Sequence, residues 1–442
     1  MSEPDDEKPR YHEKAVPSSR FSRVAKLGSL AGSLTGNIIK NTVGAAVKAQ
    51  KPTVKNTLLH LDNAKSVTKH LSQMRGAAMK LGQMLSMDAG EILPAEWEPI
   101  LAMLREKAHC MPKQQLLDML QSNWTANWQE HFDYFDFEPI AAASIGQVHK
   151  ARLKTGEELA IKVQYPGVAN SIDSDLENVA GLLKLTRLIP KGIDIDSILQ
   201  QAKQQLKQEA DYLSELEFLS TFKALLADDP RFIVPTPYSP LSTTEILCME
   251  FIDARPMAEL AYETKNTKNT VMTHLFELLF EEMFHFKFVQ SDPNFANFLF
   301  NPDTRQVVLL DFGACRTIRD SVSDDYKNVA FAMQKQDEAQ ILSSLLKLGL
   351  LNENNSEEMK STVIKACLTA SESVQCESYN FKQAQIISRL QAQTKSLMNK
   401  ENAIAAPDFD VALVNRKVAG IVLLANKLDV DIKLKELLNE HA

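Results

Sequence analysis

Two aspartates and an asparagine are the residues of this chain whose types and spacing point most directly to chemistry. They lie in the stretch QSDPNFANFLFNPDTRQVVLLDFG, residues 290 to 313. Its two short apolar runs, FLF and VVLL, are joined by a polar segment, which predicts a hairpin with a loop of about six residues. Such a hairpin would place Asn297 and Asp311 side by side, and their oxygens suit a hard cation such as Mg²⁺. Asp292, five residues before Asn297, would then face whatever the cation holds.

The order and spacing of these residues indicate a more specific class of reaction. An Asp, an Asn five residues later and a hairpin that ends in Asp-Phe-Gly have the spacing of the catalytic and metal-binding loops of kinases. The alternative is two surface turns whose carboxylates are solvated, and a lone Asp-Phe-Gly would favour that interpretation. The combination of the three features favours phosphoryl transfer.

A strand-rich region upstream is suited to bind phosphate groups. Residues 141 to 153 and 158 to 164, separated by a Lys-Thr-Gly turn, predict an antiparallel hairpin. Lys162 lies in its second strand, where alternation predicts a half-buried position; the alternative is a solvated lysine on an edge strand. Small residues precede the first strand in a loop that can bring backbone N–H groups close to phosphates. These loop residues are Ala141, Ala142, Ala143 and Ser144.

Long helices are expected next, at about 172 to 188 and 195 to 226. The second contains QEADYLSELEF, which is rich in acidic residues. Such a density of Glu usually marks a solvated helix face, although a partly buried Lys162 would need an opposite charge. Residues 244 to 251 predict a further strand, and the chain from Tyr262 onward is expected to be mainly helical apart from the 298 to 310 hairpin.

Composition bounds the class of protein. The 442 residues are 44% hydrophobic and 24% charged, which is ordinary for a soluble globular protein. The length allows two or three domains or one two-lobed unit. No run of 18 apolar residues occurs, so no spanning helix is predicted. The five cysteines are scattered, which favours a reducing setting. No targeting peptide is recognised, so we expect a cytoplasmic protein of the bacterial type. The nine histidines form no HExxH-type motif, which argues against a zinc enzyme.

The charge is unevenly distributed along the chain. Residues 8 to 55 contain ten Lys or Arg and a single acidic residue, Glu13, whereas the whole chain has a net charge of −8. A basic arm on an acidic body suggests an anionic partner, either a membrane or a nucleic acid. The arm has almost no aromatic residues that could stack on bases, so we expect a membrane surface and no nucleic acid.

Within this arm lies the uncharged segment Leu27 to Ile39, with Gly28, Gly32 and Gly36 at four-residue intervals. Thirteen residues give about 20 Å of helix, which is too short for a bilayer core of about 30 Å. Three interpretations stay open. The segment is an interfacial helix, a helix that pairs closely through its small face and so supports a homodimer, or a flexible linker.

Residues 56 to 130 have the apolar spacing of helices and contain the sequence KLGQ. Lys80 and Gln83 are three residues apart, so on a helix both point to the same side, and Gly82 allows another backbone to approach. Taken alone, KLGQ equally fits a helix with one solvated lysine.

Six motifs together resemble the UbiB-type, or AarF-type, family of atypical protein-kinase-like proteins. They are KLGQ, AAASIGQVH, AIKVQYPGV, EADYLSE, SDPNFAN and LLDFG, in that order. The resemblance extends from about residue 15 to the carboxyl end. It implies an α+β, bilobal protein-kinase-like fold with a helical N-terminal extension packed over the active site, and an alanine-rich loop in place of the glycine-rich loop of ordinary kinases.

The resemblance also implies roles for single residues. Lys162 would contact the α and β phosphates of ATP or ADP, and Glu215 would pair with it. Asn297 and Asp311 would hold Mg²⁺, and Asp292 would be the catalytic base. The resemblance further places the loop from Ala141 to Ser144, together with Glu250, among the nucleotide-binding residues.

Other family signatures point away from ordinary protein phosphorylation. Lys80 and Gln83 match a KxGQ signature, and Glu209 with Asp211 matches an ExD signature. In the family these residues pack over the active site and obstruct a peptide substrate. We therefore expect them to form a regulatory lid, in which Lys80 pairs with Glu209 or Asp211.

The function implied is that of a Mg²⁺-dependent ATPase or small-molecule kinase that supports ubiquinone biosynthesis at the membrane. Two alternatives remain. One is a true protein kinase, and the other is a nucleotide-gated scaffold or chaperone for quinone-biosynthetic enzymes or lipid intermediates. The expected organisation is a basic arm at 1–50, a helical extension at 51–130, a small lobe at 131–252 and a mainly helical large lobe at 253–442.

Overall fold

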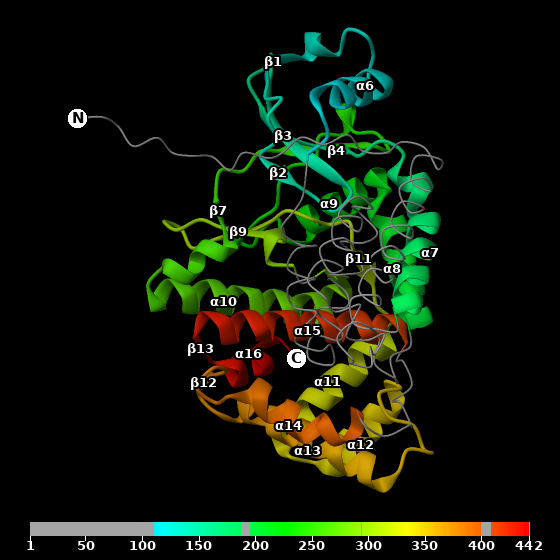
Figure 1. Cartoon of the computed structure of the whole chain (residues 1–442). Coiled ribbons are helices and arrows are strands. Elements are labelled where there is room, and N and C mark those ends of the chain that lie inside the picture. Colours follow the sequence, from blue (N-terminus) through cyan, green and yellow to red (C-terminus); the bar gives the residue numbers. More distant parts are fainter. Residues whose placement is uncertain (1–109, 187–194, 293, 399–407, 442) are drawn as a thin grey trace, which may run out of the picture. The chain divides into compact units, whose positions relative to one another are not determined.

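The computed structural model describes residues 110–186, 195–292, 294–398 and 408–441 (Figure 1). The chain divides into two compact units, which are described separately. Among the described residues, the first comprises 110–186, 195–214 and 237–251, and the second 215–236, 252–292, 294–398 and 408–441. The basic arm, the glycine-containing segment and the KLGQ residues Lys80 and Gln83 lie outside the described residues, so their predictions stay predictions.

An antiparallel sheet forms the centre of the first unit. Its strands follow the order β1, β3, β4 and β6, and β2 pairs with β3. The predicted hairpin is confirmed, because β3 and β4 pair from Gly146 opposite Gln164 to Arg152 opposite Glu158. The bounds are β1 Phe132–Phe135, β2 Ala141–Ala142, β3 Gly146–Leu153, β4 Glu158–Gln164 and β6 Ile246–Glu250.

The predicted alternation in the second strand of this hairpin is wrong. β4 lies between β3 and β6, and all of its residues except Glu158 are buried. The reason is that a central strand is covered on both faces, here in part by the helix α6, Lys113–Asn123. Lys162 is consequently buried and does not lie on an edge strand.

The helix predicted over residues 195 to 226 is two helices. α8 spans Ile195–Glu209 and α9 spans Tyr212–Leu225, after α7 at Val168–Thr186. Asp211 explains the break, because its carboxylate accepts hydrogen bonds from the backbone N–H groups of Leu213 and Ser214 at 3.2 and 3.3 Å. Asp is a preferred helix N-cap, so the sequence starts a new helix where the apolar spacing alone predicts continuity.

The second unit combines short strands with many helices, as predicted from Tyr262 onward. β5, β10, β9 and β7 form one sheet, β8 pairs with β11, and β12 pairs with β13. The strands are β5 Phe232–Ile233, β7 Arg255–Pro256, β8 Phe288–Gln290, β9 Phe298–Phe300, β10 Val307–Leu309, β11 Cys315–Thr317, β12 Tyr379–Asn380 and β13 Asp431–Ile432. The pairs β8–β11 and β12–β13 were not predicted, because strands of two or three residues are too short to show a period.

The helices of the second unit contribute many of its buried residues. They are α10 Lys265–Phe280, α11 Asp320–Lys335, α12 Glu338–Lys347, α13 Glu357–Gln375, α14 Ile386–Met398, α15 Phe409–Leu428 and α16 Leu434–His441. Short 3₁₀ segments occur in this unit at η4 Met257–Tyr262 and η6 Phe295–Asn297, and in the first unit at η2 Trp128–His131 and η3 Ser239–Leu241. η5 spans Glu281–Phe286. η5 is a π-helical turn that continues α10.

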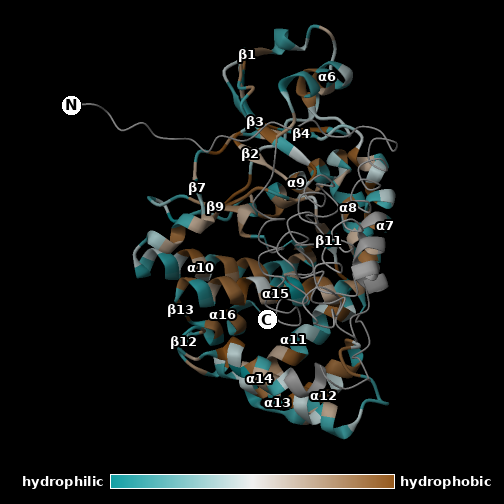
Figure 2. Ribbon diagram, viewed as in Figure 1, coloured by the Kyte–Doolittle hydropathy of each residue, from teal (hydrophilic) through white to brown (hydrophobic). Residues whose placement is uncertain are grey.

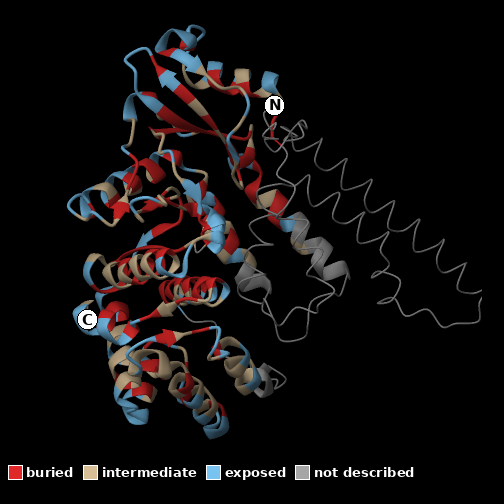
Figure 3. Cartoon of the chain, turned by 90° about the vertical axis from the view of Figure 1, so that its left-hand side faces the viewer, coloured by how far each residue is buried: buried red, intermediate tan, exposed pale blue. Residues whose placement is uncertain are grey.

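α15 is a core helix, as its apolar sequence predicts. Ile421, Leu424 and Leu428 are buried, and Figure 2 shows apolar residues along both α10 and α15. Buried positions, red in Figure 3, concentrate within the sheets and along parts of many helices. Among the described helices, none has the length and apolar character needed to cross a membrane.

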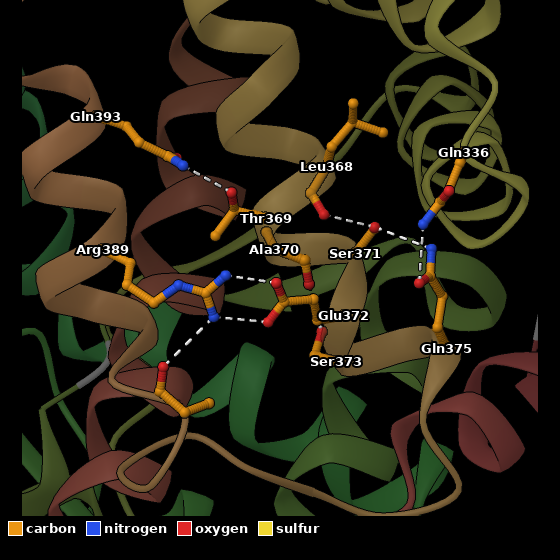
Figure 4. Close-up of polar contacts among 11 residues, drawn as sticks. Gln336, Leu368, Thr369, Ala370, Ser371, Glu372, Ser373, Gln375, Arg389 and Gln393 are labelled. Atoms are coloured by element: carbon orange, nitrogen blue, oxygen red, sulfur yellow. Dashed lines mark hydrogen bonds and ion pairs between the residues drawn. The ribbon is translucent and has the colours of Figure 1, made fainter.

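Polar contacts join α13 to α14 (Figure 4). The two terminal guanidinium nitrogens of Arg389 donate to the carboxylate of Glu372, at 2.7 and 2.5 Å. This bidentate contact lowers the pKa of Glu372. Gln393 donates to the hydroxyl of Thr369 at 2.9 Å, so the two helices are held by polar as well as apolar groups.

Candidate active site

The hairpin formed by β9 and β10 sets the positions of the candidate metal ligands. Phe298 lies opposite Leu309, and the backbone N–H of Leu310 donates to the carbonyl of Asn297 at 3.1 Å. The loop between the strands has the predicted six residues, 301 to 306. The register therefore brings Asn297 alongside the residue that precedes Asp311, although the two are far apart in the hairpin sequence.

The side chains at this end of the hairpin offer oxygen ligands. Asn297 is 6% exposed, and its amide nitrogen donates to the main-chain oxygen of Asp292 at 3.4 Å. One carboxylate oxygen of Asp311 accepts the N–H of Gly313 at 3.0 Å, which orients the side chain. Carboxylate and amide oxygens are the donors that Mg²⁺ prefers, so the residues present fit a Mg²⁺ site.

Gln290 and Ser291 tie the loop of Asp292 to the loop of Asp311. The side-chain amide of Gln290 donates to the carbonyl oxygen of Asp311. The backbone N–H and the hydroxyl of Ser291 both donate to the carbonyl of Ala314, at 2.9 and 2.7 Å. The β8–β11 ladder, in which Gln290 lies opposite Cys315, adds backbone bonds. The two loops are thus fixed to each other within the second unit.

A buried ion pair contacts the backbone of Gln290. The ammonium of Lys417, on α15, contacts the carboxylate of Glu282, on η5, and their side chains are 2% and 0% exposed. The backbone N–H of Gln290 also donates to Glu282, at 3.2 Å. Burial raises the pKa of Glu282, and the Lys417 charge opposes that rise. A continuous chain of polar contacts therefore connects α15 to the carbonyl of Asp311.

Sequence reasoning missed Glu282, Gln290 and Lys417. A signal for Lys417 exists, because it falls between Val414 and Ile421 on the apolar face of α15, where a solvated lysine would not be expected. Glu282 and Gln290 carry no comparable local signal, since their partners come from other elements.

Glu215 and Asp311 share one electrostatic neighbourhood in the second unit. The negative charges of both carboxylates raise the pKa of the Cys315 thiol. Burial, followed by the negative charge of Glu282 and those of Asp311 and Glu215, raises the pKa of this thiol well above its ordinary range. Glu215 itself is 1% exposed, so it is not part of the solvated helix face that its acidic surroundings suggested.

Aromatic contacts hold the helix of Glu215 to the Asp-Phe-Gly loop. The ring of Phe222, on α9, lies 5.1 Å from that of Phe312 and 5.2 Å from that of Phe288, measured between centroids. Phe222 and Phe312 are fully buried. Such aromatic pairs contribute about 0.5–1.5 kcal/mol beyond their buried area. They position α9 against both candidate loops.

The first unit places Lys162 at the centre of its sheet. Lys162 lies opposite Val148 on β3 and Leu247 on β6, and it is 7% exposed. Its ammonium lies 5.0 Å from the ring centroid of Tyr212, the first residue of α9, within cation–π range. A buried ammonium is stable only where opposite charges, acceptors or aromatic rings compensate it, so the residues around Lys162 are part of what keeps it charged in the sheet.

The small-residue loop is built as a tight turn. Ala141 and Ala142 form β2, and the N–H of Ala143 donates to the carbonyl of Gly146 at 2.8 Å. A Cβ added at Gly146 would lie 2.5 Å from the Val163 carbonyl oxygen, so only glycine fits there.

The two acidic residues of the ExD signature have different surroundings. Ser144 donates its hydroxyl to the carboxylate of the buried Glu209 at 3.2 Å, which links that residue to the small-residue loop. Asp211 is exposed and caps α9. Glu250, at the end of β6, is half-buried and lies opposite Leu159.

The sheet of the first unit and the paired loops of the second define a kinase-like α+β fold. The chain belongs to the ABC1 atypical kinase-like family, whose domain matches residues 103–345. It is therefore an enzyme of the atypical-kinase class, which catalyses phosphoryl transfer.

Relatives resemble the chain over almost its whole length. It is 34% identical to the mitochondrial atypical kinase COQ8 of Saccharomyces cerevisiae, over 99% of this chain and 87% of that protein. It is 33% identical to the mitochondrial atypical kinase COQ8B of Rattus norvegicus, over 98% and 82%. The solved Rv3197–erythromycin complex from Mycobacterium tuberculosis matches 91% of this chain and 98% of its own with a TM-score of 0.61, at 24% identity. That likeness supports the fold.

Proposed function

We propose that this protein binds ATP with Mg²⁺ and acts as an ATPase or small-molecule kinase that supports ubiquinone biosynthesis at a membrane surface. The observation that carries the proposal is the arrangement at the end of the β9–β10 hairpin. There the side-chain amide of Asn297 donates a hydrogen bond to the main-chain oxygen of Asp292. The strand register puts Asn297 beside Leu310, the residue before Asp311. This is the donor set and spacing of a metal-dependent phosphoryl-transfer site.

Each proposed role follows from the chemistry of its side chain. Asn297 and Asp311 would hold Mg²⁺, which when bound would neutralise phosphate charge. Asp292 would orient or deprotonate the nucleophile, and Lys162 would neutralise the α and β phosphates. Glu215 would stabilise the charged form of that lysine.

The proposed nucleotide contacts also include the small-residue loop and Glu250. Backbone N–H groups at a tight turn can bind phosphate oxygens. Alanines restrict the φ angles open to this loop more than glycines would, which favours a defined phosphate-binding conformation. The residues assigned to this role are Ala141, Ala142, Ala143 and Ser144.

The restriction to small acceptors or water rests on the family signatures. Glu209 is bonded to Ser144, so one of these signatures contacts the proposed nucleotide loop directly. Lys80, Gln83 and Asp211 would complete a lid that excludes peptides. A peptide substrate phosphorylated at a rate comparable to ATP hydrolysis would contradict this part of the proposal.

Attachment to a membrane rests on the basic arm. Ten basic residues and one acidic residue between 8 and 55 would bind an anionic surface by Coulomb attraction, which salt screens. Vesicles that contain anionic lipid should bind the protein and raise ATP hydrolysis. Deletion of residues 1 to 50 should reduce both effects; binding and hydrolysis that do not change would contradict the role of the arm.

The decisive experiment measures ubiquinone in a strain that lacks the protein, rescued with wild type, Lys162→Ala or Asp311→Asn. Loss of rescue by both variants, together with loss of Mg²⁺-dependent ATP hydrolysis in vitro, supports the proposed chemistry. Matched controls are Lys154→Ala and Asp303→Asn, which alter exposed residues of the same two hairpins. Full rescue by variants that cannot hydrolyse ATP would instead indicate a scaffold.

A further inference from the structure

A group of metal-ligating side chains lies outside the proposed phosphoryl-transfer site. It consists of Glu281 and His285 on η5 and His441 at the end of α16. One ligand atom from each residue lies within 4.8 Å of the others. Sequence analysis did not predict this cluster, because His441 is 156 residues beyond His285 and no motif includes all three residues.

The surrounding elements hold these side chains close together. The imidazole nitrogen Nδ1 of His441 lies 2.9 Å from a carboxylate oxygen of Glu281, and their side chains are 13% and 20% exposed. The rings of His285 and His441 lie 6.2 Å apart between centroids. The ring centroid of Phe280 lies 6.4 Å from that of His441. His285 is exposed, so an ion from solvent can reach the cluster.

A simple ion pair explains only part of this arrangement. Glu281 and His441 would satisfy each other without His285, whereas the structure places a second imidazole edge-on to the first. Two imidazole nitrogens and one carboxylate oxygen are a ligand set found in catalytic zinc sites, where water or substrate completes the tetrahedron.

The distance between Glu281 and His441 is close to that between two ligands of one ion, whereas the three ligand atoms as a group lie within 4.8 Å of one another. With bonds of about 2.0 Å, two ligand atoms of a tetrahedral zinc ion lie about 3.3 Å apart, near the 2.9 Å between Glu281 and His441. Two imidazole rings on one ion have centroids about 5 Å apart. A rotation of the exposed His285 side chain that moves its ring by about an ångström would bring the two rings to that distance.

We propose that Glu281, His285 and His441 bind one Zn²⁺ ion, with a solvent molecule as the fourth ligand. The ion joins α16 to η5, the turn that leads into β8 and the loop of Asp292. Its borderline-soft nitrogen ligands distinguish it from the all-oxygen Mg²⁺ site proposed at Asn297 and Asp311. The zinc site does not depend on the proposed phosphoryl chemistry.

The test is a titration of the metal-free, full-length protein with Zn²⁺ against a chromophoric zinc indicator, in excess Mg²⁺. The parent protein carries Cys376→Ser, which removes an exposed thiol. It is compared with His285→Ala and His441→Phe; the latter keeps a ring against Phe280. We expect the parent to bind one more zinc per chain than either variant, or to bind it more tightly by at least a factor on the order of 10–100.

Three further measurements separate ligation from folding. His131→Ala removes an exposed histidine of the first unit and should leave zinc binding unchanged. His441→Cys, which supplies another zinc ligand, should retain the ion, and Zn²⁺ should raise the Tm of the parent but not that of His285→Ala. Equal zinc stoichiometry and affinity in the parent, His285→Ala and His441→Phe would overturn the proposal, as would no binding at micromolar Zn²⁺.

Discussion

Lys417 and Glu282 form an ion pair that is almost completely removed from solvent, and Glu282 also accepts the backbone N–H of Gln290. We expect Lys417→Met to lower the free energy of unfolding by about 3–5 kcal/mol, because it leaves a buried carboxylate without a counter-charge. Denaturant unfolding measures the change. Lys427→Met, at an exposed position of the same helix, is the control and should change stability little.

The double variant Glu282→Gln with Lys417→Met tests the origin of that loss. It removes both charges, so we expect it to be more stable than Lys417→Met alone. A double variant that is no more stable than the single one would show that packing, and not an unpaired charge, dominates this site.

Gln290→Ala should impair the reaction more than the fold. The change removes one hydrogen bond, to the Asp311 carbonyl, and should cost about 1 kcal/mol of stability. If Asp311 holds Mg²⁺ as proposed, we expect kcat at saturating ATP to fall and the Mg²⁺ concentration for half-maximal activity to rise, each by about tenfold. Steady-state ATP hydrolysis at varied Mg²⁺ measures both quantities.

Gln306→Ala is the matched control. The side-chain amide of Gln306 also donates to a main-chain carbonyl, but this carbonyl belongs to Pro230 and not to Asp311. An equal effect of the two variants on the Mg²⁺ dependence would contradict a positioning role for Gln290.

His149 should make the first unit sensitive to acid. Burial lowers its pKa to about 4, from 6.5. In the neutral ring Nε2 accepts from Gln147 and Nδ1 donates to the Asp136 carbonyl, and the Met111 N–H fixes the Gln147 amide. Protonation would place a second donor against the Gln147 amide nitrogen.

Because the folded pKa lies below the unfolded one, stability is present above pH 6.5 and is lost as the pH falls toward 4. The loss should reach about 3 kcal/mol. Denaturant unfolding from pH 7 to 4 should show this loss in the wild type and not in His149→Gln. Parallel pH dependences of the two proteins would refute the assignment.

Asp211 combines a helix cap with a proposed role in the lid, and substitutions can separate the two. Asp211→Ala should cost about 1 kcal/mol through loss of the α9 cap, whereas Asp211→Ser keeps a capping oxygen and should cost much less. If the lid needs the carboxylate, both variants should phosphorylate peptides faster than the wild type. Unchanged peptide phosphorylation in both would leave Asp211 with the cap alone.

Local patterns were sufficient to predict the parts of the site that lie on hairpins. The turn residues at 301 to 306 and the flanking apolar runs specified the β9–β10 hairpin, and hence the approach of Asn297 to the Asp311 loop. The hairpin that carries Lys162 was equally evident. Its burial was not, because the position of β4 within the sheet depends on β6, which is distant in sequence.

The remaining features depend on pairs that are far apart in the sequence. The partner of Glu282 is 135 residues away on α15, and no local period connects the two. The break before α9 could have been foreseen, because Asp211 followed by Leu213 and Ser214 can cap a helix. Apolar spacing outweighed that signal in the prediction of a single helix.

The six-residue loop of the β9–β10 hairpin also provides a site for a reporter group. Asn301 accepts the N–H groups of Asp303 and Thr304, so the loop is folded by its own residues, and Asp303 is exposed. A dye attached through Asp303→Cys would lie at the opposite end of β9 and β10 from Asn297 and Asp311. Lengthening this loop would preserve the strand register, whereas a single residue inserted within β10 would turn its side chains to the opposite face.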